Sequence, residues 1–166
     1  MTDGITRRMV LRGAGAAGVV GALATRAPTS AWAQAGAQAP ALGGQESVQS
    51  ALKRLFGARP LKDGAGVIKL EAPPIAENGA LVQVSVEAAS PMTAANHVKT
   101  IYLVADKNRI PVVTRATLTP EMGQAFVGET IRLGETTDVR AIVEQSDGTL
   151  LQVRREVKVT VGGCGG

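Results

Sequence analysis

Two side chains stand out as candidates for chemistry, the only cysteine, Cys164, and the only histidine, His97. Cys164 lies between two pairs of glycines: Gly162, Gly163, Gly165 and Gly166. Glycine loses more backbone entropy on ordering than any other residue, and it has no apolar side chain to bury in return. We therefore expect residues 162–166 to form a flexible arm without packed structure, which carries an exposed thiol.

The surroundings of Cys164 in the sequence favour attachment over catalysis. A catalytic cysteine needs a helix N-terminus, a cation or a second cysteine nearby to favour its thiolate. None of these flanks Cys164, and the carboxylate of Gly166 is the fixed charge nearest to it. Three extended residues beyond Val161 reach roughly 10 Å, enough for the sulfur to enter a cleft of another protein. The pattern predicts a non-catalytic carrier that holds its cargo on Cys164 and is acted on by partner proteins.

His97 has no second histidine or cluster of carboxylates beside it in the sequence. Metal sites need several ligands, so we expect no metal and no cofactor. His97 is interpreted as an ordinary polar residue at the start of a strand, without a chemical role.

The N-terminal segment, residues 1–33, resembles a twin-arginine export signal. Arg7 and Arg8 precede a Gly- and Ala-rich apolar stretch, and Ala31-Trp32-Ala33 supplies small residues at a cleavage site before Gln34. The apolar stretch is shorter than the roughly 20 residues that span a bilayer. We expect a periplasmic protein with no membrane segment, exported folded and together with a partner.

Charge argues against nucleic acid as a partner. Of the 18 basic and 14 acidic residues, four arginines and one aspartate precede Gln34, which leaves a net charge of +1 for the remainder. No basic run interleaved with aromatic residues remains, so the sequence does not predict phosphate-backbone binding.

Period-two alternation dominates the rest of the chain and predicts an all-β fold. Residues 34–44 read as a flexible leader, and Glu46 to Phe56 has helical spacing with Gly57 placed to end a helix. We expect this helix at the edge or end of the domain. About seven strands are predicted, over residues 67–72, 81–88, 97–104, 110–118, 125–133, 138–145 and 150–161. Together they favour an immunoglobulin-like antiparallel β-sandwich over residues 45–161.

The last predicted strand carries the clearest alternation and one irregularity. Asp147-Gly148 is a hairpin dipeptide before it, and Arg155 falls on its otherwise apolar face. We interpret Arg155 as marking a β-bulge or an edge that faces a partner.

The ending Val-Lys-Val-Thr-Val-Gly-Gly-Cys-Gly-Gly, behind a twin-arginine signal and a β-rich domain, resembles the Y subunit of the sulfur-oxidising (Sox) carrier, the SoxY family. The resemblance covers about residues 45–166. It implies a periplasmic heterodimer with a Z-type subunit and sulfur intermediates of thiosulfate oxidation held on Cys164. It also implies transient contacts with a c-type cytochrome (SoxXA), a dimanganese hydrolase (SoxB) and a sulfane dehydrogenase (SoxCD).

Two alternatives stay open. One is a structural immunoglobulin-like module whose Cys164 only forms an intermolecular disulfide, and a disulfide-linked dimer is also expected of a carrier. The other is an independent thiol enzyme, which would need a base or cation brought to the tail by folding.

Overall fold

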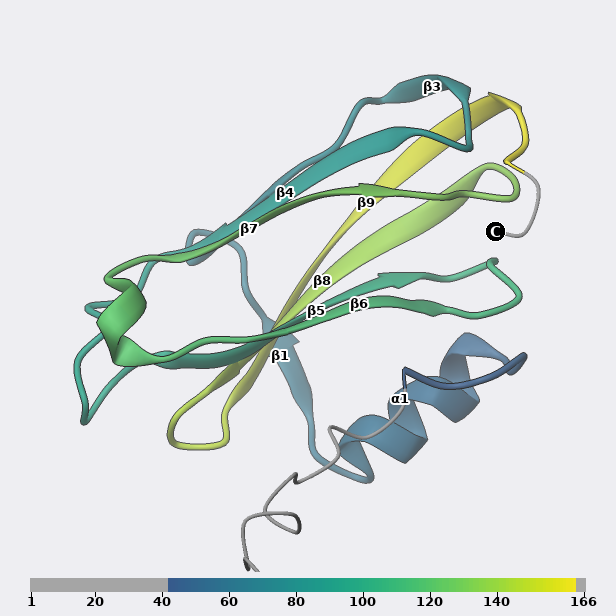
Figure 1. The fold of residues 1–166 in the computed structure, drawn as a ribbon. Helices are drawn as coiled ribbons and strands as arrows, with labels where there is room; N and C mark the ends of the chain where they lie inside the picture. The colour runs from purple at the N-terminus through teal and green to yellow at the C-terminus, as the bar shows by residue number, and fades with distance from the viewer. Residues whose placement is uncertain (1–41, 164–166) are drawn as a thin grey trace, which may run out of the picture. The chain divides into compact units, whose positions relative to one another are not determined.

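The computed structural model describes residues 42–163 as one mostly β domain (Figure 1). The predicted signal peptide, residues 34–41 of the predicted leader, Cys164, Gly165 and Gly166 lie outside the described residues. In the described part the elements follow in this order: α1 (Val48–Phe56), β1 (Leu61–Asp63), β2 (Ile68–Glu71), β3 (Ile75–Asn78), β4 (Val82–Ala88), β5 (Val98–Ala105), β6 (Val112–Thr117), the 3₁₀ turn η1 (Pro120–Met122), β7 (Ala125–Ile131), β8 (Thr137–Gln145) and β9 (Leu150–Val161).

These strands form two sheets that face each other. The larger sheet has the order β1-β9-β8-β5-β6, with β3 also paired to β9, and the smaller has the order β2-β4-β7. The main core lies between them, where Val84 and Val86 of the small sheet join Leu103 and Ala141 of the large sheet. Alternation along each strand sends branched side chains into this core, which explains why the sequence pattern was informative.

All seven predicted strands are present, but the described chain has nine, because β1 and β3 were missed. Both are short, and both pair in parallel with β9, so the predicted purely antiparallel arrangement is wrong at this edge. Three or four residues are too few to show a period, and parallel pairing with a distant strand leaves no local turn signal. The finer immunoglobulin-like assignment stays a prediction.

The predicted helix is confirmed, and its boundaries follow from its caps. The Ser47 hydroxyl accepts a hydrogen bond from the amide of Ser50 at 3.2 Å, and Gly57 closes the helix at φ 62° by donating to the Lys53 carbonyl. Among the described residues, no helix is long and apolar enough to cross a membrane.

The helix lies over the outer face of the large sheet, not at its edge or end as expected (Figure 1). Phe56 meets Tyr102 edge-on, with ring centroids 5.1 Å apart, and Ile142 completes this second core. Strand β5 is apolar on both faces, so a single sheet-to-sheet contact would have left Tyr102 and its neighbours in water.

Arg155 does not mark a β-bulge. The register between β8 and β9 runs unbroken through Val139–Arg155 and Arg140–Arg154, which corrects that expectation. The Arg155 guanidinium instead reaches across to the small sheet and donates to the Leu70 carbonyl at 3.4 Å. Arg155 remains exposed, so its charge stays in contact with water.

A bidentate ion pair fastens the turn between β5 and β6 to β8. Arg140 donates from Nε and Nη2 to the two carboxylate oxygens of Asp106, both at 2.6 Å, and each side chain is only 15% exposed. The hydrogen bond with that carboxylate raises the pKa of Arg140, so Arg140 stays positively charged at any ordinary pH.

Arg140→Met is expected to lower the free energy of unfolding by about 2–4 kcal/mol, because it leaves the Asp106 charge largely buried and unpaired. The double variant Arg140→Met, Asp106→Leu should recover most of that loss, since both charges are then absent. Urea denaturation of the two variants measures this difference. A single variant as stable as the unaltered chain would contradict the ion pair's role.

Candidate functional site at the end of β9

The residue that sequence analysis singled out, Cys164, follows directly on Gly163, the last described residue. Strand β9 ends at Val161, next to the turn between β3 and β4 and the segment between β7 and β8 (Figure 1). The register pairs Asn78 with Val161, which fixes β3 alongside the end of β9. Gly162 and Gly163, which follow β9, form the base of the tail. The surroundings of this tail base are therefore set by two connections that are far away in the sequence.

Main-chain hydrogen bonds hold the tail base. The Gly79 amide donates to the Val161 carbonyl at 2.7 Å, and the Gly163 amide donates to the Leu133 carbonyl at 2.9 Å. The Leu133 amide in turn donates to the Gly79 carbonyl at 2.7 Å, so all three segments are linked to one another by hydrogen bonds. Gly79 and Gly163 are both buried. Three segments thus meet through backbone hydrogen bonds.

This arrangement corrects the expectation that nothing packs beyond Val161. Gly162 and Gly163, predicted as part of a flexible arm, lie against the neighbouring backbone, and Gly163 has a hydrogen bond of its own. Entropy opposes the ordering of an isolated glycine run, but here backbone groups of other strands supply partners that the local pattern does not reveal. For Gly165 and Gly166 the flexible arm stays a prediction.

Sequence reasoning missed one residue that supports this base, Asn108. Its side chain is 6% exposed, donates from Nδ2 to the Arg132 carbonyl at 2.8 Å, and accepts at Oδ1 from the Gly134 amide at 3.2 Å. A buried amide that is satisfied on both sides holds its partners in register. In sequence Asn108 resembles any turn residue, so no local signal distinguished it.

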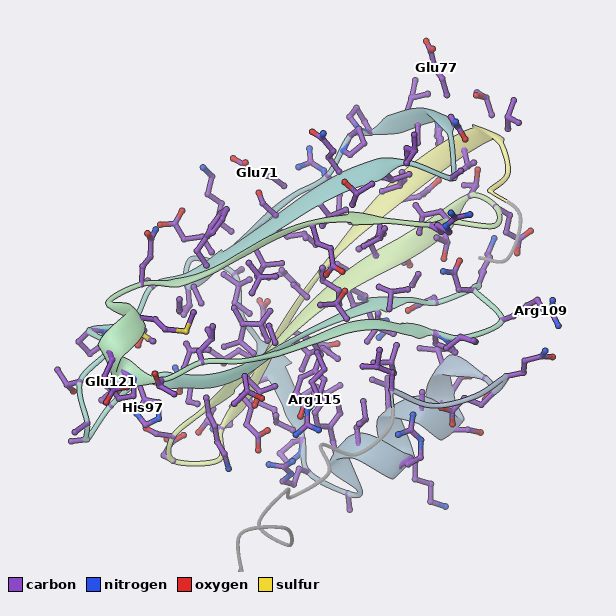
Figure 2. The ribbon with its side chains drawn as sticks, in the orientation of Figure 1. Glu71, Glu77, His97, Arg109, Arg115 and Glu121 are labelled. Atoms are coloured by element: carbon purple, nitrogen blue, oxygen red, sulfur yellow. The ribbon has the colours of Figure 1, made fainter. Side chains whose placement is uncertain are left out.

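The structure does not bring His97 to this site. His97 lies just before β5 and near Glu121, at the end of the domain opposite the end of β9 (Figure 1, Figure 2). Its Nδ1 is 3.2 Å from the Thr93 carbonyl, and the ring is half-buried. The pKa of Glu121 is lowered, chiefly by a hydrogen bond with the Thr119 side chain and only slightly by His97. Residues 42–163 contain no group of three His, Cys, Asp or Glu side chains that could hold a metal ion.

Large apolar side chains are exposed around the tail base. Val161 is 64% exposed, Leu81 in the turn before β4 is 69% exposed, and Ile75 in β3 is 57% exposed. A groove of about 1120 Å³ runs beside them between β3 and the outer side of β4, and both Ile75 and Leu81 line it. Apolar surface of this kind commonly contacts other proteins.

Together, these features define a small β-sandwich whose last strand leads, through a packed glycine pair, to a single terminal thiol. Comparison with known proteins identifies the family. The family described as "Sulfur oxidation protein SoxY" matches residues 52–164, a region that includes Cys164. The chain belongs to the SoxY family.

Solved structures agree with this assignment. The sulfur carrier protein SoxY from Chlorobium limicola f thiosulfatophilum is 30% identical, with a TM-score of 0.58 over 69% of this chain and 97% of that one. No curated protein matches the chain.

A second group of solved structures shares the fold alone. A superoxide reductase (neelaredoxin) from Ignicoccus hospitalis is 24% identical, with a TM-score of 0.51 over 56% of this chain and 79% of that one. A putative superoxide reductase from Thermotoga maritima is 18% identical, with a TM-score of 0.50 over 61% of this chain and 93% of that one. At these identities the likeness says nothing about activity.

Proposed function

We propose that this chain is a periplasmic carrier that holds the sulfur intermediates of thiosulfate oxidation covalently on Cys164. The observation that carries the proposal is the SoxY family match, which extends through the only cysteine of the chain. A solved member of the family is a sulfur carrier protein, and its structure resembles this one over most of the domain. The end of β9, three residues before Cys164 in the sequence, lies at the rim of the domain, where another protein can approach.

The chemistry of loading explains why such a carrier needs partners. Joining a thiol to thiosulfate forms an S–S bond between the Cys164 sulfur and the outer sulfur of thiosulfate, and it releases one proton and two electrons. An electron acceptor must take the two electrons, and in our proposal a c-type cytochrome does so. Water then cleaves the bond to the sulfonate group, which releases sulfate and leaves one sulfur atom on Cys164. Neither step requires catalysis by the carrier.

Tethering the intermediate to the carrier favours this sequence of steps over its release into solution. Sulfur intermediates are reactive, and attachment to one thiol raises their effective concentration at each successive enzyme. The exposed Ile75, Leu81 and Val161 offer apolar surface next to the tail, where such enzymes and a Z-type subunit would make contact. Arg7 and Arg8 support export by the twin-arginine route, which allows a folded heterodimer to reach the periplasm.

Intact-mass analysis of protein purified from cells that oxidise thiosulfate tests the proposal. We expect mass additions in increments of sulfur and sulfonate, removed by a thiol reductant and absent from the matched variant Cys164→Ser. A protein that only forms an intermolecular disulfide would instead show a dimer mass that collapses to the unmodified monomer on reduction. Unmodified mass during active oxidation would reject the carrier function.

A further inference from the structure

Gly162 and Gly163 have no room for a side chain. A Cβ atom built on Gly162 would lie 2.3 Å from the carbonyl oxygen of Gly134, and one on Gly163 would lie 2.7 Å from both the Cα and N atoms of Ala80. Real Cβ atoms do not approach backbone atoms this closely, and the backbone of a turn cannot rotate away as a side chain can. Close backbone approach, as well as flexibility, is a reason for glycine at these positions.

Gly79, on the segment that faces Gly163, also has no room for a side chain. A Cβ atom there would lie 2.3 Å from the Leu133 carbonyl oxygen and 2.8 Å from the Gly163 amide nitrogen. Those two atoms are the acceptor and donor of the hydrogen bond that holds the tail base. A side chain at position 79 would therefore press directly on that bond.

The segment that receives Gly163 is itself held in place. Asn108 bonds the carbonyl of Arg132 and the amide of Gly134, the residues on either side of Leu133. Leu133 is fully buried, so its position is fixed by the core as well as by these bonds. The carbonyl that accepts from Gly163 is thus presented by a rigid support.

We propose that Gly162 and Gly163 form a docked base for the carrier arm, with Gly79 and Asn108 as its positioning residues. The inference rests on the proposed function and deepens it: the arm that carries the cargo would start from a fixed point, Gly163, instead of from the end of β9. Covalent geometry places the Cα of Cys164 about 3.8 Å from that of Gly163. The chain therefore leaves the base at the rim formed by β3, β4 and β9, next to the residues that hold Gly163.

The docked base has a clear benefit for transfer. Each residue that is already ordered spares the entropy that an enzyme would otherwise lose on capturing the thiol. It also requires each enzyme to approach the same rim, where Ile75, Leu81 and Val161 are exposed. Recognition of the carrier and capture of its arm then occur on one surface.

Amide hydrogen exchange of the full-length chain, followed by NMR, tests this inference directly. The Gly163 amide donates to Leu133, so we expect it to exchange about tenfold or more slowly than the free-peptide rate. The Gly165 amide, beyond the proposed base, should exchange at the free-peptide rate. Equal, unprotected exchange at both glycines would overturn the docked base.

The variant Gly79→Ala provides the second arm of the test. Its methyl group should abolish the protection of the Gly163 amide, while Gly44→Ala should leave it unchanged, because nothing lies within 4 Å of a Cβ atom at position 44. Asn108→Ala, which removes the support without adding bulk, should weaken the protection as well. Full protection of Gly163 in both Gly79→Ala and Asn108→Ala would overturn the role of these residues.

A functional readout separates this inference from the carrier function. Gly79→Ala should raise the KM of the loading enzyme for the carrier about tenfold, because the arm must be ordered anew at each encounter. The rate of alkylation of Cys164 by iodoacetamide should not fall. An unchanged KM would overturn the positioning role, even where sulfur adducts on Cys164 confirm the carrier itself. Missing adducts together with a protected Gly163 amide would reject the carrier function and leave the docked base standing.

Discussion

Cys164→Ala is expected to abolish thiosulfate-dependent turnover completely and to leave the free energy of unfolding within about 0.5 kcal/mol of its original value. The loss of turnover follows because the chain has no second cysteine to receive the cargo. Stability should persist because the hydrogen bonds that close the tail base involve Gly79, Leu133, Val161 and Gly163. Sulfate production in a reconstituted mixture with the partner proteins measures the first effect, and guanidinium denaturation measures the second.

A truncation that ends the chain at Val161 is the matched comparison. It should be as inactive as Cys164→Ala, but it also removes the Gly163 amide that bonds to Leu133, so its free energy of unfolding should fall by about 1 kcal/mol. The difference between the two variants isolates the contribution of the packed glycine pair. Residual turnover in either variant would contradict a single covalent attachment point.

Leu103→Ala should have the largest effect on stability, a loss of about 2–5 kcal/mol. Leu103 is fully buried in β5 and belongs to the core between the two sheets. Its truncation leaves a cavity that the surrounding β-branched side chains cannot fill, because their rotamers are restricted. A domain of ordinary stability, about 5–15 kcal/mol, would lose a large part of it.

The matched control is Leu81→Ala, the same chemical change at a side chain that is 69% exposed. Its effect should stay within about 0.5 kcal/mol. Chemical denaturation of both variants, with the midpoint and slope fitted separately, gives the comparison. A loss below about 1 kcal/mol for Leu103→Ala would mean that the core is not centred on β5.

Much of the fold could be predicted because it depends on residues that are close together in the sequence. The alternation of Val82, Val84 and Val86 depends only on the two-residue repeat of a strand, and Gly57 ends a helix through its own backbone freedom. The position of the helix could not be predicted. Its place over β5 depends on Tyr102 and Ile142, which face outward only once the sheets have formed.

Composition and period are enough to place one thiol, Cys164, between glycines after a β-rich domain, because neither depends on distant neighbours. What the first two of those glycines do follows from the folded arrangement alone. The local pattern predicts flexibility for Gly162 and Gly163. In the fold, however, backbone atoms of Ala80, Leu133 and Gly134 contact them from other parts of the chain. Close backbone contact between segments that are remote in the sequence exists only in the folded state. That contact orders two glycines, although glycine is the residue type with the greatest backbone freedom.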